Sequence, residues 1–213
     1  MEGTLQFNQP IRSVSTTGIS LLKKFEGEIR CPNDTRKHCP YNDVSKYCTI
    51  GHGHLIQKKS CEQLSQELTE LNFIGGISDE KATEILLDDL TRAQAIVEAH
   101  LGNDKLFGKT EIDDNQYDAL VSFTFNVGGG NFNKSTLLKK LKSRENINGT
   151  ADIEFQFSRW VRSGGKVYQG LVNRRADEAK HFFANYGLPS ELEEYEAVLG
   201  VTEEAFLDIA IGE

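Results

Sequence analysis

The chain has 213 residues and a formal net charge of −8 at pH 7. This length suits one domain, or one domain divided into two lobes, and is enough to bury an ample core. The charge is uneven, because residues 188–213 contain eight acidic residues and no lysine or arginine, which leaves 24 acidic and 24 basic residues in positions 1–187. A neutral body with an acidic tail argues against non-specific nucleic-acid binding, which requires a basic surface.

Targeting signals are not evident in the sequence. No apolar run approaches the roughly 20 residues that span a bilayer, so we expect no stable membrane insertion. Residues 1–18 lack a basic start followed by an apolar core, so we expect no signal peptide and synthesis in the cytoplasm.

The first predicted elements are an arm, a helix and a small sheet. Residues 1–14 show no periodicity and are predicted to be an arm or linker. Ser15 and the two threonines that follow offer helix-capping hydroxyls, and apolar residues then recur at helical spacing as far as Glu26. Residues 28–56 contain prolines, glycines and short β-branched or aromatic runs, which favour a small antiparallel sheet.

Helices are predicted for most of the remaining chain. A short one covers residues 61–71, and a long one starts at Ser78 and runs to residue 101, about 35 Å at ~1.5 Å per residue. A capping box formed by Asp113 and Gln116 precedes a helix that stops at the glycines from residue 128. Further helices are expected from residue 135, over 150–162 and over 170–186, and an acidic extension covers 188–213. The prediction is an α+β, predominantly helical fold.

Four cysteines, at positions 31, 39, 48 and 61, fall close together. No pair has the two-residue spacing typical of a structural zinc site, so we expect no metal despite nearby histidines. Two disulfides would suit an oxidising compartment, and any of three pairings is open; the alternative is four free thiols.

A set of residues typical of glycosidase chemistry lies between residues 23 and 55. Glu26 closes the first helix, Asp43 follows, and Thr49 precedes a glycine-broken run that ends at His54. A general acid, a second carboxylate and a hydroxyl are the groups needed to hold one attacking water against a glycosidic bond. The glycines allow the backbone to pass close to a ligand.

This stretch and two later blocks resemble the phage-type lysozymes, also called endolysins or muramidases (glycoside hydrolase family 24). The resemblance spans roughly residues 19–186 and is carried by four groups of residues: Phe25-Glu26-Gly27 with Asp43, Thr49-Ile-Gly-His-Gly-His54, Gln116 to Gly128 with Ser135 to Lys139, and Gly170 to Ala179. One departure is the distance from Glu26 to Asp43, seventeen positions where the family has about eight or ten. The extra residues lie around positions 31–40, and they make Asp34 a rival for the role of Asp43.

The resemblance implies a lysozyme-like fold of two lobes joined by the long helix. The domain would cover residues 15–187, with a small β-containing lobe at about 26–60 and a helical lobe at about 61–187. The activity implied is an N-acetylmuramidase that cleaves the β-1,4 bond between N-acetylmuramic acid and N-acetylglucosamine without a cofactor. Glu26 would donate the proton, while Asp43 and Thr49 position the water. His54 and Asn126 are candidate substrate-binding or site-supporting residues.

Two other activities stay open at this point: a lytic transglycosylase, and a catalytically silent module that binds the cell wall or a partner. The substrate implied is bacterial peptidoglycan, reached after lysis or by a dedicated secretion route, in the setting of a phage endolysin or of an antibacterial secretion effector. An inhibitor or immunity protein is a candidate partner, and we expect a monomer.

Overall fold

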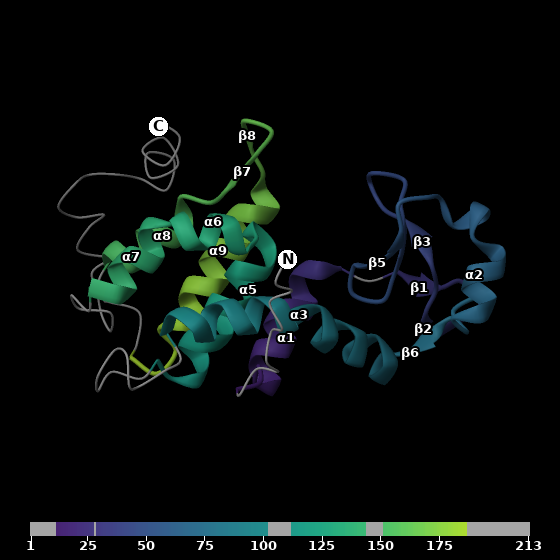
Figure 1. The fold of residues 1–213 in the computed structure, drawn as a ribbon, viewed down its shortest axis with the longest axis horizontal. Helices are drawn as coiled ribbons and strands as arrows, with labels where there is room; N and C mark the ends of the chain where they lie inside the picture. The colour runs from purple at the N-terminus through teal and green to yellow at the C-terminus, as the bar shows by residue number, and fades with distance from the viewer. Residues whose placement is uncertain (1–11, 28, 102–111, 144–150, 187–213) are drawn as a thin grey trace, which may run out of the picture. The chain divides into compact units, whose positions relative to one another are not determined.

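The computed structural model describes residues 12–27, 29–101, 112–143 and 151–186 (Figure 1). The chain forms two compact units: residues 22–92, here called the β unit, and the chain before and after them, here called the helical unit. The fold is α+β and predominantly helical, as the sequence predicts. Within the described ranges, no helix combines the length and apolar character needed to cross a membrane.

The β unit begins in the last turns of the first helix and contains two three-stranded sheets. Its elements are the end of α1 (Thr16–Glu26), β1 (Arg30–Cys31), β2 (Asp34–His38), β3 (Tyr41–Asn42), β4 (Cys48–Ile50), β5 (His54–Gln57), a short 3₁₀ helix (Cys61–Gln63), α2 (Ser65–Glu70), β6 (Ile77–Ser78) and the start of α3 (Asp79–Leu101).

Both sheets are antiparallel. The first has the order β1-β2-β6, with His38 opposite Ile77, and the second has the order β3-β4-β5. In the second sheet Tyr41 lies opposite Thr49, and Thr49 lies opposite Leu55. The strands are short because prolines, glycines and turns interrupt them, as predicted for this stretch.

The core of the β unit explains which helices belong to it. Cys48 packs with Leu64 and Leu68 of the segment that includes α2, and Ile50 packs with Ile77 and with Ala82 of α3. The structure therefore groups residues 61–92 with the sheets, whereas the sequence-based boundary between the two lobes lies at about residue 60. The difference arises because apolar burial, and not the change from strand to helix, holds these segments together.

In the described part of the chain, the helical unit contains the start of α1, the end of α3 and five further helices. These are α5 (Asp114–Val127), α6 (Gly129–Lys134), α7 (Thr136–Ser143), α8 (Ala151–Ser158) and α9 (Gln169–Phe182), with a hairpin of β7 (Arg162–Ser163) and β8 (Lys166–Val167). α9 packs against both α5 and α8 (Figure 1).

Aromatic rings fill the centre of the helical unit. Phe123 of α5 is fully buried and contacts Phe132, Phe157 and Trp160 edge to face, at ring-centroid distances of 6.3, 5.4 and 5.7 Å. Edge-to-face contacts place the positive edge of one ring on the negative face of another. These contacts stabilise the fold.

A buried ionic network connects α9 to α5. Glu178 is fully buried and pairs with Arg174 and Arg175, with N–O distances of 3.0 Å to each. The Ser122 hydroxyl also donates to Glu178 at 2.7 Å. The two arginines therefore belong to the interior. Their sequence neighbourhood favours either a solvated face or an ion pair with Asp177 or Glu178, and the pair with Glu178 is confirmed.

The described end of the N-terminal segment packs against the helical unit. Val14 is buried, its amide donates to Gln94, and the Arg12 amide donates to Glu98 at 2.7 Å. Residues 12–14 are thus not part of a detached arm, because ionic and apolar contacts hold them. Residues 1–11 and the acidic extension 188–213 lie outside the described residues.

Candidate active site

Glu26 is the last residue of α1 and is half-buried. Gly27 follows with φ +68°, a left-handed conformation that ends the helix. The turn between β4 and β5 passes beside the Glu26 carboxylate, because a Cβ placed on Gly53 would lie 3.7 Å from its Oε2. Gly53 has φ +83°, a backbone conformation that favours glycine here.

The neighbouring sheet presents Tyr41 and Thr49 together. The two residues are directly opposite on the antiparallel strands β3 and β4, so their side chains project from the same face. Thr49 is 4% exposed, and its hydroxyl donates to the Tyr47 carbonyl at 3.1 Å. That hydroxyl still has acceptor capacity for a further donor such as water.

Asp43 follows β3 directly and shapes the β3–β4 turn. Its Oδ1 accepts hydrogen bonds from the backbone amides of Ser45 and Tyr47, both at 2.8 Å. Its backbone amide donates to the Tyr47 carbonyl at 2.9 Å. Within the described residues, Oδ2 makes no hydrogen bond. The turn thus fixes the orientation of the carboxylate through one oxygen and leaves the other for a ligand.

The charges of Asp43 and Glu26 both affect the phenol of Tyr41. Burial raises the pKa of its phenol first, and the negative charges of Asp43 and Glu26 raise it further. The phenol therefore stays protonated at neutral pH. Tyr41 was not found by sequence reasoning; its position two residues before Asp43, across a short turn from Thr49, is the signal that indicates it.

The rival carboxylate has different surroundings. Asp34 belongs to β2, in the other sheet of the β unit. Both of its oxygens accept from the Arg36 guanidinium, at 2.9 and 3.2 Å, and these bonds are the main reason that the pKa of Asp34 is lowered. Its side chain is engaged by a cation, whereas Asp43 keeps one oxygen available.

His54 opens β5 and forms an ion pair with α3. Its Nδ1 lies 2.9 Å from Oδ2 and 3.1 Å from Oδ1 of Asp89. The hydrogen bond to Asp89 raises the pKa of His54, against an opposing effect of burial. This geometry fits a site-supporting residue, and binding of substrate by His54 stays a prediction. Asp89 was not found by sequence reasoning, because nothing local marks one acid among several on that helix.

Asn126 belongs to the helical unit, near the end of α5, and is exposed. Its side-chain oxygen accepts from Arg175 at 3.0 Å, and Arg175 in turn pairs with buried Glu178. The hydrogen bond from Arg175 therefore orients the Asn126 amide. Binding of an N-acetyl group by Asn126 stays a prediction.

Two disulfides occur in the β unit. They join Cys31 to Cys39 and Cys48 to Cys61, with Cα–Cα distances of 4.9 and 4.7 Å. Of the three pairings that the sequence leaves open, the structure has the one that links consecutive cysteines. Cys48 immediately precedes Thr49, so the second disulfide anchors the strand that carries the candidate hydroxyl.

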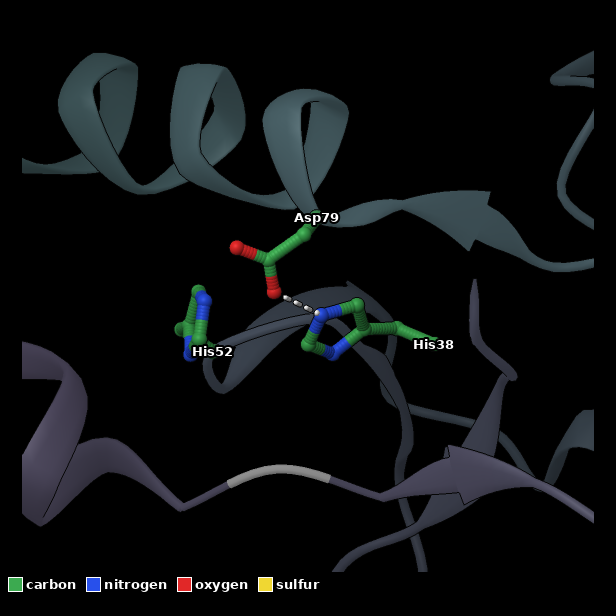
Figure 2. A group of neighbouring side chains, drawn as sticks. All are labelled: His38, His52 and Asp79. Carbon is green, nitrogen blue, oxygen red and sulfur yellow. Dashed lines mark hydrogen bonds and ion pairs between the residues drawn. The ribbon is translucent and has the colours of Figure 1, made fainter. Parts of the chain in front are cut away.

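One group of side chains in the described part of the chain could hold a metal ion. It consists of His38, His52 and Asp79, whose ligand atoms all lie within 4.8 Å of one another (Figure 2). None of the three is among the residues that the sequence singles out for proton transfer or for holding water.

Comparison with known proteins defines the class that this fold and these residues represent. A sequence profile of the family described as phage lysozyme matches residues 33–178. The chain therefore belongs to the phage lysozyme family.

Individual relatives agree with this assignment. The endolysin of Bacillus phage PZA is 40% identical over 180 residues, which cover 84% of this chain and 57% of that endolysin. The chain thus spans about half the length of the endolysins of Bacillus phages PZA and B103.

Solved structures also match. The structure of a P22 lysozyme mutant is 28% identical, with a TM-score of 0.58, over 81% of this chain and 99% of that one. The muramidase domain of SpmX from Asticaccaulis excentricus is 25% identical, with a TM-score of 0.55, over 80% and 97% of the two chains.

Proposed function

We propose that this protein is a peptidoglycan hydrolase, an N-acetylmuramidase that cleaves the β-1,4 bond between N-acetylmuramic acid and N-acetylglucosamine. The observation that carries the proposal is the oxygen of Asp43 that makes no hydrogen bond among the described residues, directly after the strand that pairs with Thr49, in a member of the phage lysozyme family whose first helix ends at Glu26. The same family includes proteins whose names are endolysin and lysozyme, and a muramidase domain shares the fold.

In the proposed reaction Glu26 donates its proton to the leaving glycosidic oxygen. The available oxygen of Asp43 takes a proton from water, and the Thr49 hydroxyl holds that water through its remaining acceptor capacity. Attack from the face opposite the leaving group inverts the anomeric carbon. Inverting enzymes keep their two carboxyl groups roughly 6.5–9.5 Å apart to leave room for the water, and we expect that separation between Glu26 and Asp43 in the substrate complex.

Digestion of purified peptidoglycan by three variants tests these roles. Glu26→Gln keeps the size and shape of the side chain but removes the proton donor, so we expect activity to fall on the order of 100- to 10,000-fold. Asp43→Asn should lose activity to a similar degree. Asp34→Asn is the matched control, and we expect it to retain activity, because Asp34 serves an ion pair with Arg36 in the other sheet.

Two outcomes would contradict the assignment. Full activity in Glu26→Gln with an unchanged circular dichroism spectrum would show that Glu26 is not the proton donor. Loss of activity in Asp34→Asn, with retention in Asp43→Asn, would assign the role of base to Asp34 in place of Asp43.

The products separate hydrolysis from the two alternatives. A lytic transglycosylase closes a 1,6-anhydro ring with the sugar's own hydroxyl and needs no water, so its muropeptides are lighter by one water in mass spectrometry. Asp43 and Thr49 support hydrolysis because each keeps acceptor capacity for water: one Asp43 oxygen makes no hydrogen bond among the described residues, and the Thr49 hydroxyl uses its proton on the Tyr47 carbonyl. A catalytically silent binding module would release no fragments and would leave the turbidity of a cell-wall suspension unchanged.

We further propose that the protein acts on the bacterial wall outside the cytoplasm, as a phage endolysin or as the lysozyme domain of a secretion effector. The endolysin relatives support the first setting. A monomeric state and an inhibitor or immunity partner stay predictions, which light scattering and co-purification from the producing cell test.

A further inference from the structure

His38, His52 and Asp79 come from three separate elements of the β unit. His38 ends β2, His52 lies in the turn between β4 and β5, and Asp79 is the first residue of α3. Figure 2 shows the two imidazole rings and the carboxylate turned toward a common space. The rings meet edge to face with centroids 5.1 Å apart, and Nε2 of His38 lies 3.0 Å from Oδ1 of Asp79.

Both histidines are buried and are incompletely bonded. His38 is fully buried and His52 is 4% exposed. Among the described residues, neither nitrogen of His52 has a hydrogen-bond partner, and Nδ1 of His38 also lacks one. The Gly27 carbonyl faces the His52 ring and favours its protonated form, but its geometry falls short of a hydrogen bond. Buried polar atoms without partners are unfavourable and are rare in native proteins.

We propose that His38, His52 and Asp79 bind one Zn²⁺ ion. Two imidazoles and a carboxylate are an established donor set for zinc, with a fourth position for water. The ion would take the place of the hydrogen bond between Nε2 of His38 and Oδ1 of Asp79.

The distances require a modest adjustment. Ligand atoms of a tetrahedral zinc site lie about 3.4 Å from one another when each bond is about 2.1 Å. The three donors here lie within 4.8 Å, so the widest pair would close by somewhat more than 1 Å. Rotation of the Asp79 and His52 side chains supplies a movement of that size without a change in the strands.

Two cations near Asp79 oppose binding and indicate where the ion would bind. Arg30 contacts Oδ1 at 3.0 Å, and Lys23 contacts Oδ2 at 3.2 Å. An ion on Oδ1 displaces Arg30 and leaves Lys23 in place. Arg30 lines a surface hollow together with Asp34, Glu80 and Asp79, so after displacement it stays among acidic side chains. The same hollow gives an ion access to Asp79, the half-buried member of the set.

The proposed ion has a structural role. It would join β2, the β4–β5 turn and α3, which the chain otherwise holds together by packing and hydrogen bonds. His52 precedes Gly53, whose backbone lies against the Glu26 carboxylate. An ion bound to His52 would therefore stabilise the β4–β5 turn next to Glu26, the proposed proton donor.

Zinc titration of chelator-treated protein tests the proposal by calorimetry, with Co²⁺ absorption as a second readout of coordination. We expect one Zn²⁺ per chain. His52→Gln should weaken binding on the order of 100-fold or more, since loss of a ligand exceeds the 10- to 100-fold effect of losing a group behind a ligand. Asp79→Asn should do the same. His100→Gln, which removes a histidine of the helical unit, is the control and should bind as the wild type does.

A further variant, Arg30→Gln, distinguishes this site from adventitious binding. Arg30→Gln removes the cation that competes for Oδ1, so we expect zinc binding to tighten on the order of tenfold. Absence of stoichiometric binding, equal affinity of wild type and His52→Gln, or loss of binding in His100→Gln would overturn the proposal. Circular dichroism and melting of each metal-free variant verify that the fold is kept. The result is independent of the proposed hydrolysis, because the measurement is of ion binding alone.

Discussion

Glu178→Gln tests the buried ionic network of the helical unit. Glu178 is fully buried between Arg174 and Arg175, whose side chains are 4% and 1% exposed. The substitution preserves the shape of the side chain but removes the negative charge that pairs with both guanidinium groups. The N–H groups of the new glutamine amide would also face the N–H groups of the two arginines, so donors would meet donors.

The expected loss of stability follows from burial. Removal of one partner from a buried ion pair costs about 3–5 kcal/mol, because the other charge stays in a low-dielectric interior. We expect the free energy of unfolding to fall by that amount. For a chain of this size, 1 kcal/mol corresponds to about 2–4 °C, so the melting temperature should fall by roughly 6–20 °C.

Calorimetry and urea denaturation measure this change, with Glu84→Gln as the matched control. Glu84 also pairs with a cation, Lys81 at 2.8 Å, but its side chain is 63% exposed. An exposed pair contributes about 0–1 kcal/mol, so the control should melt close to the wild type. If the free energy of unfolding falls by the same small amount in both variants, burial does not control the strength of this network and the prediction is wrong.

Three further predictions concern the β unit. Since Asp89 raises the pKa of His54 above its ordinary 6.5, the ion pair contributes fully below about pH 6.5 and is lost as pH rises through the raised pKa. His54→Gln in metal-free protein should therefore lower the melting temperature most near pH 5.5 and least near pH 9. Removal of the Cys48–Cys61 disulfide by alanine substitution should cost about 3 kcal/mol, as its loop has a sequence separation of 13. Gly53→Ala should cost about 1–2 kcal/mol, because φ +83° is strained for a residue with a Cβ.

Each of these has a result that contradicts it. A His54→Gln difference that stays constant with pH would show that the ion pair does not titrate as described. Titration of native protein that finds four free thiols would exclude the disulfides. Gly75 lacks a positive φ and has open space around its Cβ position, so Gly75→Ala is the control for Gly53→Ala, and equal losses in the two would exclude backbone strain.

Local sequence patterns predicted most helices, because a helix start depends on neighbouring residues. The capping box of Asp113 and Gln116 is confirmed, with Gln116 N donating to the Asp113 side chain at 2.8 Å. The long helix expected from Ser78 begins at Asp79, and Ser78 instead ends β6 and accepts from the Lys81 amide at 3.2 Å. Capping and periodicity act within a few residues, so they are visible in one sequence.

The partners of charged side chains were not visible in the same way. For Arg174 and Arg175 the sequence favoured a solvated face or an ion pair with Asp177 or Glu178; the pair with Glu178 is confirmed, but burial under α5 and the contact with Ser122 were not visible. Tyr41 was expected only as a strand-forming residue, but burial and the charges of Asp43 and Glu26 raise the pKa of its phenol. The identity of a partner across space depends on how distant segments pack, which local periodicity does not contain.

The sequence by itself determined the family, the order of the elements and the candidate acids, because ordered motifs and apolar periodicity are written along the chain. Only the tertiary structure decided how those acids differ. Asp34 accepts hydrogen bonds from Arg36, whereas one oxygen of Asp43 makes no hydrogen bond among the described residues. Asp43 directly follows the strand that pairs with the strand of Thr49. The tertiary structure also gathered His38, His52 and Asp79 from three elements. The physical reason is that strand pairing and core packing join residues far apart in the chain, and the chemistry of a carboxylate or an imidazole depends on the groups that then surround it.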